Sequence, residues 1–232
     1  MLNGSINTLI FDLDNTLIDR NAALRLGLQG LLKRVYAEPV RQTVLDDIMQ
    51  YDNWGYTNRD EFCSWFLHTY GREVLGKEEF RYFTRERLLK IFQLMILQNM
   101  EPAPAVQAAL HSLATQFQFV LATNGSSNIQ RQKLRQAELE TFFQPEAIFI
   151  SGEMGCEKPD SLFFQKIMQK LQLDPGNTMV IGDSLYHDIQ GAAACGLFTC
   201  WVSHGREGSA SIQANKIITN ITETGKWTKQ LI

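Results

Sequence analysis

The sequence predicts an α/β protein with a parallel sheet, helices on both faces of that sheet, and a helical domain inserted after the first strand. Two observations lead to this fold class. After residue 101, short apolar runs alternate with helical segments, which is typical of parallel sheets. Between residues 19 and 97, almost every signal is helical. We therefore expect a core formed by residues 1–18 and 98–232, and a helical domain formed by residues 19–97.

Six short apolar runs are expected to form the strands of the core. The run FQFVLAT is almost continuously apolar, as a strand covered on both faces should be. The starts of two helices between the runs can also be predicted. Pro104 can open one helix at its first position, and another helix is expected to begin at Asp160. The expected strands are residues 6–12, 117–123, 147–151, 178–183, 198–203 and 216–220.

The inserted block contains amphipathic helices and many aromatic residues. Thr57 or Asn58 can cap a helix whose first turn is acidic. The aromatic residues are Trp54, Tyr56, Phe62, Trp65, Phe66 and Tyr70. We expect them to pack among the helices, because Phe62 and Phe66 are four residues apart. The alternative is that a few of them, with Asn58 or Arg59, line a substrate pocket.

Composition narrows the class of protein. The chain has 232 residues, is 44% hydrophobic and carries a formal net charge of -3, without the basic stripe of a nucleic-acid binder. Its four cysteines have no zinc-site or redox spacing, which indicates a reducing compartment. The N-terminus does not resemble a signal peptide, and the most apolar helix is too short to span a bilayer. We expect a cytoplasmic protein that binds neither nucleic acid nor membrane.

Polar residues gather where the expected strands end. Ligands of open parallel sheets bind at the carboxyl ends of the strands, so these residues are candidates for a site. The candidates are Asp12 and Asp14 after the first strand, Thr123, Asn124 and Gly125 at the second, Lys158 after the third, and Asp183 and Asp188 after the fourth.

The four acids of this group call for a cation. A side-chain period of two puts Asp12 and Asp14 on one side, with Leu13 turned toward the interior. Four carboxylates cannot all ionise close together unaided, and Lys158 supplies one positive charge. A hard divalent cation with oxygen ligands, Mg²⁺ first among them, is therefore expected.

The same residues resemble the motifs of a known family. DLDNT at 12–16, the T-N-G turn at 123, the lysine of EKPD, and GDSLYHD at 182–188 occur in the order of the four motifs of the haloacid dehalogenase-like hydrolase superfamily. The match covers the chain apart from the inserted block, which is similar to that superfamily's helical cap. The resemblance implies a Rossmann-like core with a smaller all-helical cap.

The resemblance also implies roles in catalysis. Asp12 would be the nucleophile that forms an aspartyl-phosphate, and Asp14 the general acid for the leaving oxygen and then the base for water. Mg²⁺ would be held by the Asp12 carboxylate, the Asp14 backbone carbonyl and Asp183. Lys158 would neutralise the transferred group, and Asp188 would orient Lys158 or a metal-bound water.

The remaining implied residues surround the phosphoryl group. Thr123 would bind it together with the backbone N–H groups of Asn124 and its neighbour Gly125, at a helix N-terminus. His187, between the two acids of GDSLYHD, is expected to be exposed and without a role.

The second acid distinguishes between the reactions of this superfamily. Its dehalogenases resemble the chain at Asp12 but lack an acid at the position of Asp14, because halide needs no proton to leave. We therefore expect a Mg²⁺-dependent phosphatase whose partner is a small phosphomonoester, of the sugar phosphate, nucleoside monophosphate or N-acylneuraminate 9-phosphate type. The alternatives are a phosphomutase or dehalogenase of the superfamily, or a non-catalytic regulatory protein with the same fold.

Overall fold

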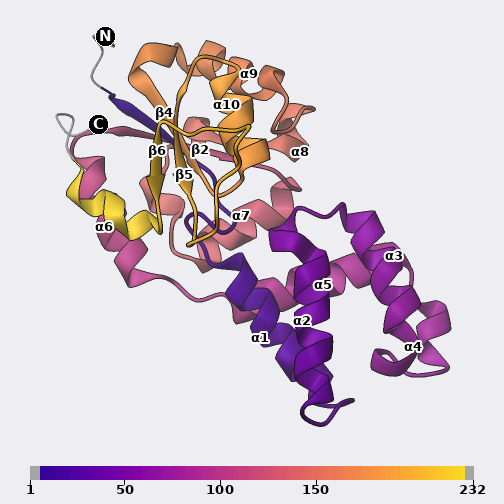
Figure 1. The fold of residues 1–232 in the computed structure, drawn as a ribbon. Helices are drawn as coiled ribbons and strands as arrows, with labels where there is room; N and C mark the ends of the chain where they lie inside the picture. Colours follow the sequence, from indigo (N-terminus) through magenta and orange to yellow (C-terminus); the bar gives the residue numbers. More distant parts are fainter. Residues whose placement is uncertain (1–5, 228–232) are drawn as a thin grey trace. The chain divides into compact units, whose positions relative to one another are not determined.

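The computed structural model describes residues 6–227, and the chain divides into two units that are described here one at a time (Figure 1). The α/β unit comprises Met1–Ile18 and Glu101–Ile232, and the helical unit comprises Asp19–Met100. The predicted boundary at residue 97 falls inside a helix, because α5 (Arg85–Asn99) continues past Leu97, whose side chain is buried.

The α/β unit is built on a six-stranded sheet in which every neighbouring pair is parallel. Its strand order is β3-β2-β1-β4-β5-β6, so β1 lies next to both β2 and β4. The strands are β1 (Thr8–Phe11), β2 (Gln118–Thr123), β3 (Ile148–Ile150), β4 (Thr178–Gly182), β5 (Phe198–Val202) and β6 (Lys216–Ile218). Each predicted strand is present, and the predicted α/β fold with a parallel sheet is confirmed.

Helices connect the strands and cover the sheet. They are α6 (Pro104–Ala114), α7 (Ser127–Gln136), α8 (Ser151–Met154), α9 (Ser161–Leu171) and α10 (Gly191–Ala193), with a π-helical turn η6 (Leu185–Gln190) before α10 and short 3₁₀ turns at η3 (Glu140–Phe142), η4 (Pro145–Ala147), η5 (Pro175–Asn177) and η7 (Ile221–Lys226). Pro104 opens α6 as predicted. The helix expected from Asp160 is α9, which begins one residue later; Asp160 caps it by accepting a 2.9 Å hydrogen bond from the N–H of Leu162.

The two faces of the sheet have separate packing. One face carries Ile10, Val120 and Val180, which form a core with Phe163 and Phe164 of α9. Alternation of side chains turns Phe11 to the opposite face, where its ring lies 5.1 Å from that of Phe119, centroid to centroid. The strand order reverses its direction beside β1, so the connections between strands run over both faces of the sheet. In open sheets of this kind, the crevice where ligands bind lies at the carboxyl ends of the strands beside the reversal, here β1 and β4.

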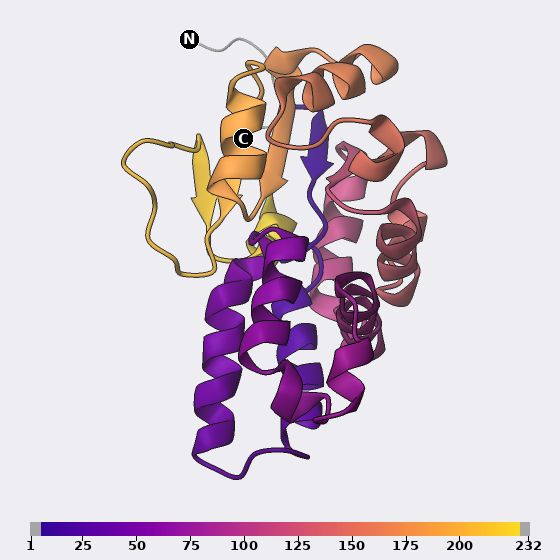
Figure 2. The same cartoon turned by 90° about the vertical axis from the view of Figure 1, so that its right-hand side faces the viewer.

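The helical unit contains five helices, drawn in indigo to magenta in Figure 2. They are α1 (Arg20–Leu32), α2 (Val40–Asp52), α3 (Arg59–Thr69), α4 (Gly71–Val74) and α5, with 3₁₀ turns at η1 (Asn53–Gly55) and η2 (Glu79–Tyr82). Asn58 caps α3 as predicted, since its side chain accepts from the N–H groups of Asp60 and Glu61. No helix within residues 6–227 is both long enough and apolar enough to cross a membrane.

Aromatic side chains hold this unit together. The rings of Phe62 and Phe66 each lie 5.1 Å from that of Phe92 on α5, and both side chains are buried. Trp65 stacks on Tyr51 of α2 at 4.0 Å. The prediction that these residues pack among the helices is confirmed for Phe62 and Phe66, so the pocket alternative fails for these two.

A buried ion network links the start of the unit to its middle. Asp52 has no exposed surface and forms ion pairs with both Arg20 and Arg59. Arg59 Nη1 lies 2.8 Å from Asp52 Oδ1. Burial by itself would raise the pKa of Asp52, but the two guanidinium groups outweigh it and hold the pKa below its ordinary value. Arg59 also donates to the carbonyl of Thr57 at 2.9 Å, so two groups of the helical unit hold its guanidinium.

Candidate active site

The two acids after β1 leave the sheet together. The N–H of Asp12 still bonds to Ile181 of β4 at 2.9 Å, which extends the ladder one residue beyond β1. The chain then turns, with Asn15 at a φ of 58° and the N–H of Leu17 bonded to the carbonyl of Leu13. Leu13 is fully buried, as predicted. The carboxylates of its neighbours Asp12 and Asp14 pair with different ammonium groups, that of Lys158 for Asp12 and that of Lys133 for Asp14.

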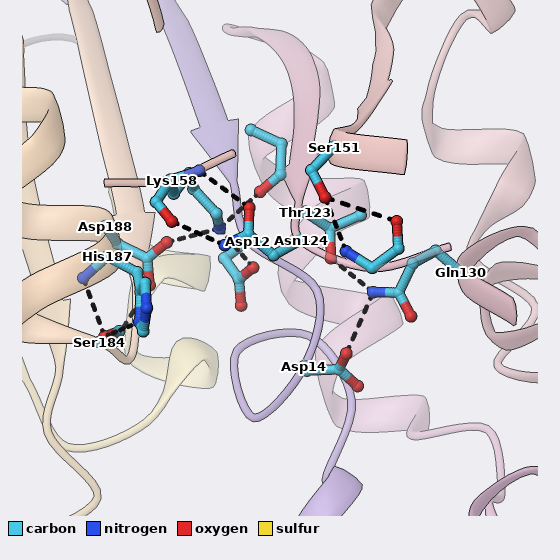
Figure 3. Close-up of polar contacts among 12 residues, drawn as sticks. Asp12, Asp14, Thr123, Asn124, Gln130, Ser151, Lys158, Ser184, His187 and Asp188 are labelled. Atoms are coloured by element: carbon cyan, nitrogen blue, oxygen red, sulfur yellow. Dashed lines mark hydrogen bonds and ion pairs between the residues drawn. The ribbon is translucent and has the colours of Figure 1, made fainter. Parts of the chain in front are cut away.

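Lys158 joins Asp12 to Asp188. Its Nζ lies 2.7 Å from Oδ1 of Asp12, 2.6 Å from Oδ1 of Asp188 and 2.8 Å from the carbonyl oxygen of Ala122 (Figure 3). All three charged side chains are buried. The pKa of Asp12 is raised to about 7, mainly because the carboxyl group is buried; Lys158 opposes this rise, and the charges of Asp188 and Asp14 add to it. Burial works against the charged lysine, but the two carboxylates hold the Lys158 pKa above its ordinary value.

Asn124 fixes the backbone on which Lys158 sits. Its side chain donates to the carbonyl of Lys158 at 2.8 Å and accepts from the N–H of Lys158 at 3.0 Å. This reciprocal pair joins the carboxyl end of β2 to the loop that follows α8. The side chain of Asn124 therefore positions Lys158. The backbone N–H of Asn124 is the group that was expected from the sequence to bind the phosphoryl group.

The crevice has a carboxylate cluster of the kind that binds cations. One oxygen each of Asp12, Asp183 and Asp188 lies within 4.8 Å of the others, and all three residues are buried. A set of carboxylate oxygens fits a hard divalent cation better than a soft one. Both oxygens of Asp188 are already engaged, by Lys158 Nζ at 2.6 Å and by the N–H of Ser184 at 3.0 Å.

Asp14 pairs with a cation that the sequence analysis did not assign. Lys133 of α7 places Nζ at 2.7 Å from both oxygens of Asp14. Gln130, one turn earlier, donates to Asp14 Oδ2 at 3.0 Å and to Thr123 Oγ1 at 2.6 Å (Figure 3). The assumption that Lys158 alone meets the four acids is therefore wrong, because α7 supplies a second buried ammonium group.

Asp183 is held from β5 and the loop after it. Its backbone carbonyl accepts from Trp201 Nε1 at 2.9 Å and from Arg206 at 2.7 Å, and the same arginine lies 3.4 Å from Asp183 Oδ2. In this loop His204 Nε2 also lies 2.6 Å from the carbonyl oxygen of Asn15. The segment 203–211, which is rich in serine and glycine, thus contacts the loops after β1 and β4 through His204 and Arg206.

Two further residues differ from the expectation. The N–H of Gly125, at a φ of 138°, donates to Ser151 Oγ at 3.0 Å and is engaged inside the protein. His187 is half-buried, not exposed, and its Nδ1 lies 3.0 Å from Ser184 Oγ. Burial lowers the pKa of His187. Its ring is held by the loop that carries Asp183 and Asp188.

Residues 9–202 match the family model described as haloacid dehalogenase-like hydrolase. The chain belongs to this family. Among curated relatives, it is 31% identical to the pyrimidine 5'-nucleotidase PynA of Streptococcus pneumoniae, over 83% of this chain and 82% of that protein. It is 28% identical to the N-acylneuraminate-9-phosphatase of Homo sapiens, over 85% of this chain and 83% of that protein.

Solved structures agree with the family. The crystal structure of the HAD-hydrolase YfnB from Bacillus subtilis bound to magnesium superposes with a TM-score of 0.71 at 27% identity, covering 94% of this chain and 96% of that chain. The predicted membership of the haloacid dehalogenase-like hydrolases is therefore confirmed, and the named relatives support its phosphatase branch.

The haloacid dehalogenase-like motifs led to most of this site, but not to all of it. Gln130, Lys133 and Arg206 were missed because helix α7 and the loop after β5 are polar in sequence and look like solvated surface. One signal was available for α7. Residues three apart share a helix face, and the face that follows a T-N-G turn at a strand end points toward the crevice.

Proposed function

We propose that this haloacid dehalogenase-like hydrolase is a Mg²⁺-dependent phosphatase of small phosphomonoesters that works through an aspartyl-phosphate. The observation that carries the proposal is the buried Asp12 carboxylate, paired at 2.7 Å with Lys158 Nζ and adjacent to Asp183 and Asp188. A nucleophile, a cation for the phosphoryl group and acidic metal ligands are thereby assembled at one crevice.

In the first half of the proposed reaction, a carboxylate oxygen of Asp12 attacks phosphorus. The bond from phosphorus to the ester oxygen breaks, and Asp14 gives its proton to that oxygen, so an alcohol leaves. Lys158 Nζ donates to Oδ1 of Asp12, and within the described residues no hydrogen bond to Oδ2 is found. We therefore assign the attack to Oδ2.

In the second half, water attacks the phosphorus of the aspartyl-phosphate. Asp14, now ionised, accepts the proton of that water, and the acyl–phosphate bond breaks to release inorganic phosphate and restore Asp12. The protons balance over the two halves, because Asp14 gives one proton to the leaving oxygen and recovers one from water. A dehalogenase would not need this acid.

The phosphoryl oxygens are proposed to bind between β2 and Lys158. The Thr123 hydroxyl and the backbone N–H of Asn124 lie just before the N-terminus of α7, which favours an anion. Gly125 belongs to this turn, where its positive φ is needed, although its own N–H is occupied by Ser151. Lys158 adds the positive charge that the transferred group requires.

The metal is proposed to be held by the Asp12 carboxylate, the Asp14 backbone carbonyl and Asp183. When bound, Mg²⁺ supplies positive charge that offsets the charge of the phosphoryl group and of the crowded carboxylates. Asp188 is proposed to act on Lys158, because both of its oxygens are already in use.

The helical unit is proposed to be the cap that selects the substrate. The family relatives named above act on a pyrimidine nucleotide and on an N-acylneuraminate phosphate. We therefore place the substrate among nucleoside monophosphates, sugar phosphates and N-acylneuraminate 9-phosphate, all of which are small soluble phosphomonoesters.

The function is tested by phosphate release from p-nitrophenyl phosphate and from a panel of these three ester classes. We expect turnover with Mg²⁺, loss of it in EDTA and recovery when Mg²⁺ is restored, because the carboxylates of the crevice need a cation to bind an anionic ester. Full activity in metal-free buffer, or no phosphate release from any ester, would contradict the proposal.

The two acids after β4 should respond differently to substitution. Asp183→Asn is expected to raise the Mg²⁺ concentration for half-maximal activity by more than about 100-fold, since it removes a direct ligand, and Asp188→Asn by about tenfold, since it acts through its neighbours. Magnesium titrations of both variants measure this. Equal shifts would mean that Asp188 is itself a ligand.

A further inference from the structure

Helix α7 presents two buried polar side chains to the acid that follows Asp12. Gln130 and Lys133 are three residues apart and therefore share one face of the helix. Their neighbour Arg131 lies on another face and pairs with Glu153 at 2.9 Å on the surface. The inward pair lies outside the four sequence motifs quoted above.

The contacts of this pair are specific and converge on one carboxylate. The Lys133 ammonium group lies 2.7 Å from each oxygen of Asp14, and the Gln130 amide lies 3.0 Å from Oδ2. The ion pair joins residues 119 positions apart in the chain, so the fold creates it and local sequence does not.

The Lys133 ammonium group is buried, which is unfavourable for a charged group unless it is paired. The Lys133 side chain is 7% exposed, whereas that of Asp14 is 25% exposed. An acid at the edge of a crevice could be satisfied by water alone. Taking an ammonium group out of water is unfavourable, and an ion pair offsets this cost only when its geometry is good. A fixed carboxylate position is what this geometry provides.

Gln130 also links Asp14 to the proposed phosphate site. Its amide nitrogen donates one hydrogen to Asp14 and the other to Thr123 Oγ1 at 2.6 Å (Figure 3). Because the Thr123 hydroxyl accepts this bond, its own hydrogen is left for a phosphoryl oxygen. The same side chain therefore orients a phosphate-binding hydroxyl and the acid that serves the leaving oxygen.

We propose that Lys133 and Gln130 are positioning residues that hold the Asp14 carboxyl group in place for proton transfer to the leaving oxygen. This inference rests on the proposed function, in which Asp14 is the general acid. Lys133 can keep its contact to one oxygen of Asp14 while the other oxygen carries the proton. Misplacing a catalytic group by about 1 Å can lower a rate by about 100-fold.

The test compares two esters that differ in their need for the acid. p-Nitrophenolate leaves without help, whereas an alkoxide needs a proton, so kcat/KM for an alkyl phosphate reports on Asp14. Lys133→Met should lower kcat/KM for the alkyl phosphate by about 100-fold and that for p-nitrophenyl phosphate by about threefold. Lys133→Arg, which keeps the charge, should recover part of the loss.

Arg131→Met is the matched control, because it removes an ion pair from the same helix without touching Asp14. It should leave both values within about twofold of the parent. The half-maximal Mg²⁺ concentration of Lys133→Met should also remain that of the parent. A merely structural role for Lys133 would instead change both esters, or the metal response, together.

A double-mutant cycle with Asp14→Asn separates this inference from the proposed function. If Lys133 acts through Asp14, adding Lys133→Met to Asp14→Asn should cause no further loss with the alkyl phosphate. If Asp14→Asn alone keeps parental activity, the proposed role of Asp14 fails.

If Asp14→Asn is impaired but Lys133→Met keeps parental activity, lowers both esters equally, or multiplies the loss of Asp14→Asn, the inference is overturned. Circular dichroism checks the fold of each variant. Should Lys133→Met not fold, Lys133→Gln decides by the same criteria, because it keeps a hydrogen-bond donor at this buried position.

Discussion

Asp12→Asn is expected to lower kcat by about 10⁴-fold or more, as removal of a covalent nucleophile does in other hydrolases. The amide has the shape of the carboxyl group but neither its charge nor its nucleophilicity. The fold should survive, because Lys158 keeps its ion pair with Asp188 and the crevice loses one of its neighbouring carboxylates. Phosphate release under saturating substrate and Mg²⁺ measures the loss, and circular dichroism checks the fold.

The same prediction has a structural readout. Beryllium fluoride mimics an acyl-phosphate, so a crystal grown with it should carry the adduct on Asp12. An adduct on Asp14 or Asp183 would reverse the proposed roles. Activity of Asp12→Asn within tenfold of the parent would exclude Asp12 as the nucleophile.

Lys158→Met should damage both stability and turnover. It leaves Asp12 and Asp188 as two buried carboxylates without their shared cation, which is expected to lower the free energy of unfolding by about 3–5 kcal/mol in metal-free buffer. It also removes the charge proposed to stabilise the transferred phosphoryl group, for a loss of about 10²–10³-fold in kcat. Urea denaturation and phosphate release measure the two effects.

Two further variants separate these effects of Lys158. Adding Asp188→Asn to Lys158→Met should restore much of the stability, since one unpaired charge is removed, but none of the activity. Lys166→Met is the matched control, because Lys166 Nζ donates to the carbonyl of Met154 at 2.9 Å outside the crevice. If the double variant regained activity as well as stability, the role of Lys158 would be charge balance alone.

Much of the fold and of the proposed site can be predicted from the sequence, and the reason is physical. Alternating apolar runs and helices specify a parallel sheet, and a parallel sheet brings the residues that follow its strands to one edge. Asp12, Lys158 and Asp188 are far apart in the chain, yet each follows a strand, and the structure joins them within 2.7 Å contacts. Family motifs then supply their expected roles.

The tertiary structure alone decided how these charges are paired. Asp12 and Asp14 are two positions apart and look equivalent in sequence, but Asp12 meets Lys158 and Asp14 meets Lys133. Lys133 and Arg206 come from a polar helix and a polar loop, where the sequence does not tell a solvated cation from an inward one. Their direction depends on how α7 and the segment after β5 pack on the sheet. That packing is set by apolar contacts of other residues, so no local pattern around a lysine or arginine can report which carboxylate it will reach.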